Sequence, residues 1–107
     1  MASKFPIVTP ATRLDILSRD SLKQDIHEAA AAGPVHVLVD LEGVTFIDSA
    51  GLGALVSALK TLRTQGGSLS LCAPSDQIRT LLEITSLNKI FPIYGNRQAF
   101  LDQHAGT

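Results

Sequence analysis

The stretch Val44-Thr45-Phe46-Ile47-Asp48-Ser49-Ala50-Gly51-Leu52-Gly53-Ala54-Leu55 decides the fold of this 107-residue chain. Its first residues are apolar and partly β-branched, as in a buried strand, and its last residues begin a run of apolar side chains at helical spacing. Ser49 stands at the joint, where a helix start leaves backbone N–H groups free and places the positive end of the helix dipole behind the hydroxyl. Such a corner can hold a phosphate group.

Strands and helices alternate on both sides of this corner. The expected strands cover residues 5–8, 35–41, 68–72 and 90–94, and the expected helices run from 18 or 19 to 33, from the corner to 65, from 76 to about 88, and from 97 onward. In the third helix the predicted inward residues are Ile78, Leu81, Leu82 and Ile84. Alternation of this kind predicts an α/β fold with about four strands in a mainly parallel sheet and about four helices.

The ends of the chain refine this prediction. Pro6 and Pro10 interrupt the first strand, and because proline cannot donate to a strand ladder, we expect a shortened strand at the edge of the sheet. Residues 35–41 are almost continuously apolar, which is typical of a central strand covered on both faces. The length predicts one domain over residues 1–107, with a core from about 5 to 103.

Composition excludes several classes of function. Nine basic and ten acidic residues are scattered along the sequence, so no basic stripe indicates nucleic acid or anionic lipid, and proteins are the expected partners. No apolar run approaches the roughly 20 residues of a membrane span, and the start lacks a signal-peptide hydrophobic region. Cys72 is the sole cysteine, which fits a cytoplasmic protein. No metal-ligand spacing appears, so we expect neither metal nor cofactor.

Three roles are open to Ser49 from the residues alone. Its hydroxyl could cap the helix by accepting a backbone N–H, it could be a catalytic nucleophile, or it could accept a phosphate. The Gly-x-Ser-x-Gly pattern of a nucleophile is absent, and the histidines, His27, His36 and His104, have no local relation to the serine.

Residues 46–53 resemble the Asp-Ser-Ser/Thr-Gly-Leu-Gly signature of the STAS domains, the anti-sigma factor antagonists. Arg13-Leu14-Asp15, followed by a helix containing Ser21-Leu22-Lys23-Gln24, is similar to the Leu-Asp turn and first helix of that family, and Gly66-Gly67-Ser68-Leu69 is similar to the turn after its second helix. The resemblance covers residues from about 14 to 101.

This resemblance implies a non-enzymatic switch. In similar proteins the serine directly after the aspartate, here Ser49, is phosphorylated by a partner anti-sigma factor serine kinase. That kinase would supply the ATP, because this chain has no Walker loop or kinase signature. The unphosphorylated form would bind the kinase and release the sigma factor, and a metal-dependent serine phosphatase would reset the switch. The alternatives are an accessory STAS subunit of a transporter or other signalling assembly, without a phosphoswitch, and a small serine hydrolase.

The expected partner-binding residues surround the serine, and each has a structural alternative. They are Asp15, Asp48, Ala50, Gly51, Leu52 and Gly53. Asp15 could instead cap the turn into the first helix, and Asp48 could be an acidic residue placed favourably before a helix start. The glycines could permit close packing against the sheet, and the leucine could be core.

Two features depart from the family pattern. Position 50 is alanine where the family often has a second serine or threonine, so a hydroxyl that could assist the kinase is missing. Only about a dozen residues precede Leu14, where the family usually has two strands. The shortened strand would leave a sheet edge uncovered, and an exposed edge can pair with another chain, so we expect either a homodimer or an altered partner surface.

Overall fold

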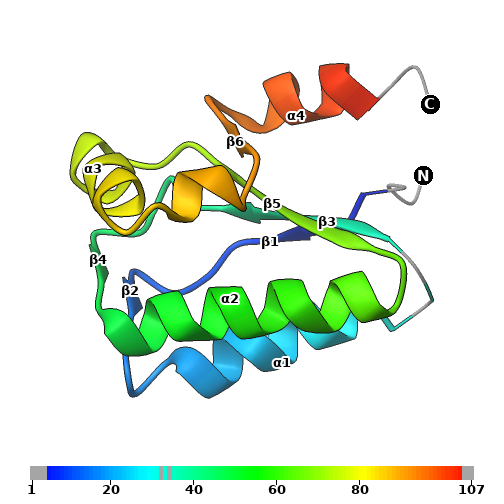
Figure 1. The fold of residues 1–107 in the computed structure, drawn as a ribbon, viewed down its shortest axis with the longest axis horizontal. Coiled ribbons are helices and arrows are strands. Elements are labelled where there is room, and N and C mark those ends of the chain that lie inside the picture. The colour runs from blue at the N-terminus through cyan, green and yellow to red at the C-terminus, as the bar shows by residue number, and fades with distance from the viewer. Residues whose placement is uncertain (1–4, 32, 34, 105–107) are drawn as a thin grey trace.

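The computed structural model describes residues 5–31, 33 and 35–104, and its centre is a four-stranded parallel sheet (Figure 1). The strands are β1 (Ile7–Val8), β3 (His36–Asp40), β5 (Ser68–Cys72) and β6 (Ile93–Tyr94), in the spatial order β1-β3-β5-β6. The central position predicted for residues 35–41 is therefore confirmed, as is the edge position of the first strand. Each new strand is added on the same side of the previous one.

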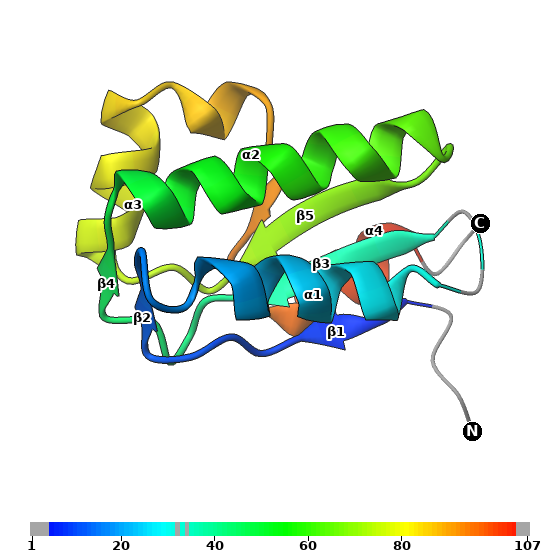
Figure 2. The ribbon, with the colours of Figure 1, turned by 90° about the horizontal axis from the view of Figure 1, so that it is seen from below.

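The described residues form four α-helices, as predicted. They are α1 (Arg19–Ala29), α2 (Ser49–Thr64), α3 (Asp76–Ile84) and α4 (Arg97–His104), and the 3-10 turn η1 (Leu87–Lys89) follows α3. Since right-handed crossovers that advance in one direction leave their helices on one face, α1 and α2 lie side by side below the sheet (Figures 1 and 2). Helix α4 follows the last strand and lies on the opposite face.

The hydrophobic core is divided by the sheet. The larger cluster joins the inner faces of α1 and α2 to strands β3 and β5, with Leu55, Leu69 and Leu71 fully buried. The smaller cluster, Leu38, Cys72 and Phe100, fills the space under α4. Asp40 is buried at the end of β3 and forms an ion pair of 2.5 Å with Arg97, which holds α4 against the sheet.

Local signals explain where the helices begin and end. The Ser75 hydroxyl accepts a hydrogen bond from the Ile78 N–H at the start of α3, and the Asn96 side chain accepts one from the Ala99 N–H at the start of α4. At the end of α2, Gly66 has a φ of +84°, a left-handed conformation that glycine adopts without strain.

Several boundaries differ from the prediction. Helix α1 ends at Ala29 rather than at residue 33. The last strand contains only Ile93 and Tyr94, because the Ile90 and Phe91 N–H groups donate to the Leu87 carbonyl and so belong to the turn that follows η1. Ile84 was predicted to point inward but is 76% exposed. It lies two positions after buried Leu82, about 200° around the helix, and therefore on the opposite face. Of the expected core, residues 32 and 34 lie outside the described residues.

Candidate functional site

A second, two-stranded sheet builds the corner that contains Ser49. Strand β2 (Arg13–Leu14) pairs in parallel with β4 (Phe46–Ile47), and Leu14 is the register partner of Ile47. Asp15 and Asp48 directly follow these partners, so the two aspartates leave the pair at the same end. The Asp48 N–H donates to the Leu14 carbonyl at 3.1 Å, which fixes the first strand-to-helix turn against the second.

Asp48, and not Ser49, caps α2. One carboxylate oxygen of Asp48 accepts a hydrogen bond from the Gly51 N–H at 3.0 Å, and its backbone carbonyl accepts one from the Leu52 N–H at 2.9 Å. Asp48 is therefore the N-cap of α2, a role that was not predicted for it from the sequence. Ser49 is exposed, and within the described residues its hydroxyl has no hydrogen-bond partner. The capping role that the sequence left open for Ser49 is thus taken by its neighbour.

Asp15 organises the turn between β2 and α1. Its carboxylate accepts hydrogen bonds from the Leu17 and Ser18 N–H groups at 3.0 and 3.2 Å, and it lies 3.4 Å from the Arg13 guanidinium. Partial burial would raise the pKa of Asp15, but the Leu17 N–H, Arg13 and the Ser18 N–H outweigh this effect and hold the pKa below its usual value. Asp15 is therefore a carboxylate that shapes the loop beside Ser49.

The two glycines of the motif have different surroundings. A Cβ on Gly51 would lie 2.2 Å from the Leu14 carbonyl oxygen, so this buried glycine allows α2 to approach β2 closely. A Cβ on Gly53 would have no atom within 4 Å, and Gly53 is exposed. Close packing therefore explains Gly51 but not Gly53. Leu52 is half-buried and packs against the core, which agrees with the alternative that this leucine is a core residue rather than a partner contact.

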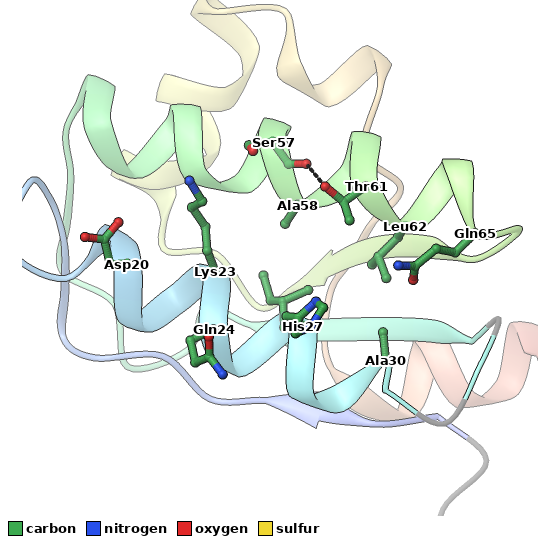
Figure 3. A pocket seen from close by; sticks show the side chains of 11 residues that line it. Asp20, Lys23, Gln24, His27, Ala30, Ser57, Ala58, Thr61, Leu62 and Gln65 are labelled. Carbon is green, nitrogen blue, oxygen red and sulfur yellow. Dashed lines mark hydrogen bonds between the residues drawn. The ribbon is translucent and has the colours of Figure 1, made fainter.

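A hollow of about 430 Å³ lies between the first turns of α1 and α2. Helix α2 contributes Ser49, Ala50, Gly53 and Ala54, and helix α1 contributes Arg19, Asp20 and Lys23. The predicted serine, alanine and exposed glycine are thus brought together with charged side chains that the sequence did not single out. A larger hollow of about 450 Å³ continues along the two helices. Lys23 lines both hollows, and Figure 3 shows its side chain extending from α1 toward α2.

Exposed apolar side chains lie beside the corner. Leu17 is 91% exposed and Ile16 56% exposed in the turn after β2, and Phe46 on β4 is 38% exposed, with the Arg13 guanidinium 4.2 Å from its ring centroid. We call Ile16, Leu17 and Phe46 the apolar rim. Ile16 and Leu17 were not singled out from the sequence, although two apolar residues just before a helix start can indicate a contact surface. The rim offers a contact surface next to Ser49.

The histidines lie elsewhere. None of the described residues that line the hollow with Ser49 is a histidine. The His36 and His104 ring centroids are 5.3 Å apart, and both rings lie near Phe5 in the layer of α4. His27 lines the larger hollow, farther along α1. The geometry therefore gives a Ser49 nucleophile no imidazole base.

Cys72 is buried, and the burial, together with the nearby Asp40 carboxylate, raises its pKa to about 12. Within the described part of the chain, no group of three or more histidine, cysteine, aspartate or glutamate side chains is arranged to hold a metal ion. Among the same residues, no helix has the length and apolar character needed to cross a membrane.

Comparison with known proteins identifies the family. The STAS domain family model matches residues 3–99. The chain is 31% identical over 91 residues to the anti-sigma F factor antagonist of Paenibacillus polymyxa, covering 84% of this chain and 78% of that protein. It is 32% identical over 90 residues to the anti-sigma-B factor antagonist of Staphylococcus aureus (strain NCTC 8325 / PS 47), covering 84% and 83%.

A solved structure agrees with these relatives. The anti-sigma-factor antagonist (STAS) domain protein of Planctomyces limnophilus superposes with a TM-score of 0.81 at 27% identity, over 92% of this chain and 89% of that one. The β2–β4 corner, the parallel sheet and the matched sequence lead to one conclusion. The chain belongs to the STAS domain family.

Proposed function

We propose that this protein is an anti-sigma factor antagonist whose binding to an anti-sigma factor serine kinase is switched by phosphorylation of Ser49. The observation that carries the proposal is the position of Ser49: it is exposed at the first residue of α2, and its hydroxyl is left available because Asp48 caps the helix. The similarity to two anti-sigma factor antagonists supports the class of partner. The kinase supplies the ATP, and a metal-dependent serine phosphatase resets the switch.

The surroundings of Ser49 form the partner-binding surface in this proposal. Asp15 and Asp48 hold the two turns in place, Ala50 and Gly53 keep the hollow open beside the serine, and Gly51 and Leu52 anchor the first turn of α2 against the core. The apolar rim supplies surface that becomes buried in the complex. A binding module of this kind needs no catalytic base beside Ser49.

Phosphorylation acts on this surface through charge. It adds about −1.5 to −2 charges at pH 7 next to two carboxylates. In the free protein the phosphate lies at the exposed surface, but in the complex the partner would have to desolvate it. If the binding free energies of the two forms differ by about 3 kcal/mol, the phosphorylated form binds the partner more than a hundredfold more weakly. The unphosphorylated protein therefore binds the kinase and frees the sigma factor, and the phosphorylated protein dissociates.

The decisive experiment combines mass spectrometry with partner capture. Protein from its native cells is analysed for phosphate at Ser49, and wild type, Ser49→Ala and Ser49→Asp are used to capture partners from lysate. Ser86→Asp is the matched control, because it adds the same charge at an exposed serine in the turn after α3. We expect wild type, Ser49→Ala and Ser86→Asp to retain a kinase-like protein that Ser49→Asp loses.

Two outcomes would contradict the proposal. If Ser49 carries no phosphate under any growth condition and all forms capture the same partners, the switch is wrong and a constitutive accessory subunit of a transporter or signalling assembly replaces it. If acyl-ester turnover is found and depends on Ser49, the protein is a hydrolase.

The homodimer expected from an uncovered sheet edge is a separate proposal. Its candidate edge is β1, which has two residues and lies between Pro6 and Pro10, so it offers few backbone groups for pairing. Sedimentation of the protein over a concentration series tests it directly. A constant monomer mass would contradict it.

A further inference from the structure

We propose that Arg19 and Lys23 form a binding site for the phosphate of phosphorylated Ser49 within the same molecule. The inference rests on the proposed function, because it takes Ser49 as the phosphoacceptor. All three side chains line the hollow between the first turns of α1 and α2. The site would thus be built before the modification arrives.

Both cations are available for a phosphate. The only ion pair of Arg19 within the described residues is a 3.9 Å contact with Asp20, whose side chain is 87% exposed, and such a pair contributes little. Lys23 has no ion pair among the same residues, and its side chain extends toward α2 (Figure 3). Because the two cations are four positions apart on α1, they share one helix face and repel each other weakly. A phosphate between them would remove that repulsion.

The helix starts add to the positive potential. Helices α1 and α2 run side by side in the same direction, so both N-terminal ends lie at this corner (Figure 2). The Ser49 and Ala50 N–H groups have no acceptor within the described residues, and they lie in the first turn of α2. The dipoles of both helices therefore favour a negative group in the hollow.

Nearby carboxylates oppose the phosphate only in part. Asp15 and Asp48 already accept hydrogen bonds from backbone N–H groups, and neither lines the hollow. Asp20 lines the hollow, but its exposed side chain can turn toward solvent. Among the residues that line the hollow, two cations thus face one carboxylate.

This site would enlarge the effect of phosphorylation. Arg19 and Lys23 are exposed in the unmodified protein and are available to a partner. When the phosphate draws both side chains toward Ser49, the partner loses these two positive charges as well as meeting a new negative one. The switch would then alter a surface that includes the first turns of both helices.

The test measures the second pKa of the phosphate. Phosphoserine is incorporated at position 49 of the full chain during translation, without any kinase, and the phosphate is titrated by ³¹P NMR. We expect a second pKa about half a unit below the usual value of about 6, since nearby cations favour the dianion. Arg19→Gln and Lys23→Gln should each raise it by a few tenths, and the double variant should restore about 6.

Lys60→Gln is the matched control, because Lys60 is exposed on α2 and lines none of the described hollows. It should leave the phosphate pKa unchanged. The same pKa in the parent protein and in all variants would overturn the proposed phosphate site. An absence of phosphate at Ser49 in native cells would instead overturn the proposed function, and the NMR result would be unaffected by it.

Discussion

Replacing Gly51 by alanine tests the contact that joins α2 to β2. The new Cβ would lie 2.2 Å from the Leu14 carbonyl oxygen and 2.7 Å from the carbonyl carbon, and both are backbone atoms that cannot rotate away. The two elements must therefore separate by at least about 1.2 Å to reach an ordinary contact distance of about 3.4 Å. That movement would also strain the hydrogen bond from the Asp48 N–H to the Leu14 carbonyl.

The expected magnitude follows from three effects. Overpacking costs about 1–3 kcal/mol, and loss of the hydrogen bond costs about 1 kcal/mol. Alanine contributes about 1 kcal/mol through its better helix propensity. We therefore expect Gly51→Ala to lower the free energy of unfolding by roughly 2 kcal/mol and the Tm by about 10 °C.

Gly53→Ala is the matched control in the same helix, because its Cβ would meet no atom within 4 Å. It should raise the free energy of unfolding by up to about 1 kcal/mol. Urea titration followed by far-UV circular dichroism measures both variants. If Gly51→Ala is as stable as wild type, or if the two variants change stability equally, the reasoning from the Leu14 contact is refuted.

Three further predictions concern other parts of the molecule. Arg97→Ala should lower the free energy of unfolding by about 2 kcal/mol at pH 7, because it leaves the buried Asp40 carboxylate without its cation. Burial would raise the Asp40 pKa, but the Glu42 N–H and Arg97 lower it overall, so the stabilisation is present above about pH 4 and is lost as the pH falls through the folded pKa. Urea titrations of wild type and the variant should therefore converge at low pH. A difference that is constant with pH would contradict this. Cys72 should resist a thiol reagent at pH 8 until the protein unfolds, because its pKa is about 12, and rapid labelling of native protein would show otherwise. Leu17→Ala should change stability by less than about 0.5 kcal/mol, since the side chain is 91% exposed, yet weaken capture of the kinase at least about tenfold if it fills a partner pocket; unchanged capture would remove the apolar rim from the interface.

The regular elements could be predicted because their signals are local. The apolar run of β3 and the helical spacing of α2 each lie within one segment, and Ser75 and Asn96 cap helices whose sequences follow directly. Ile84 shows the limit of such patterns, because an apolar residue does not reveal whether its helix position faces the core.

The corner could be predicted only in part. The motif located Ser49 at the helix start, but capping was considered only for Ser49, and the structure gives that role to Asp48. Both side chains can accept the same backbone hydrogen bond, so the sequence did not distinguish them. The β2–β4 pair was not predicted, since two-residue strands carry almost no pattern and pair over a long separation. Arg19 and Lys23 were missed for a related reason: their place beside Ser49 follows from the packing of α1 on α2.

The β2–β4 pairing also determines when the corner can exist during synthesis. Thr45 donates its N–H to the carbonyl of Thr12, 33 positions earlier in the chain, and all of α2 follows the pairing. Contacts of this separation form only after the intervening loop closes, so a nascent or unfolded chain contains the Ser49 sequence without the assembled corner. A kinase that recognises the corner rather than the peptide would modify only chains that have folded. Phosphorylation of Ser49 would then depend on correct folding as well as on the activity of the kinase.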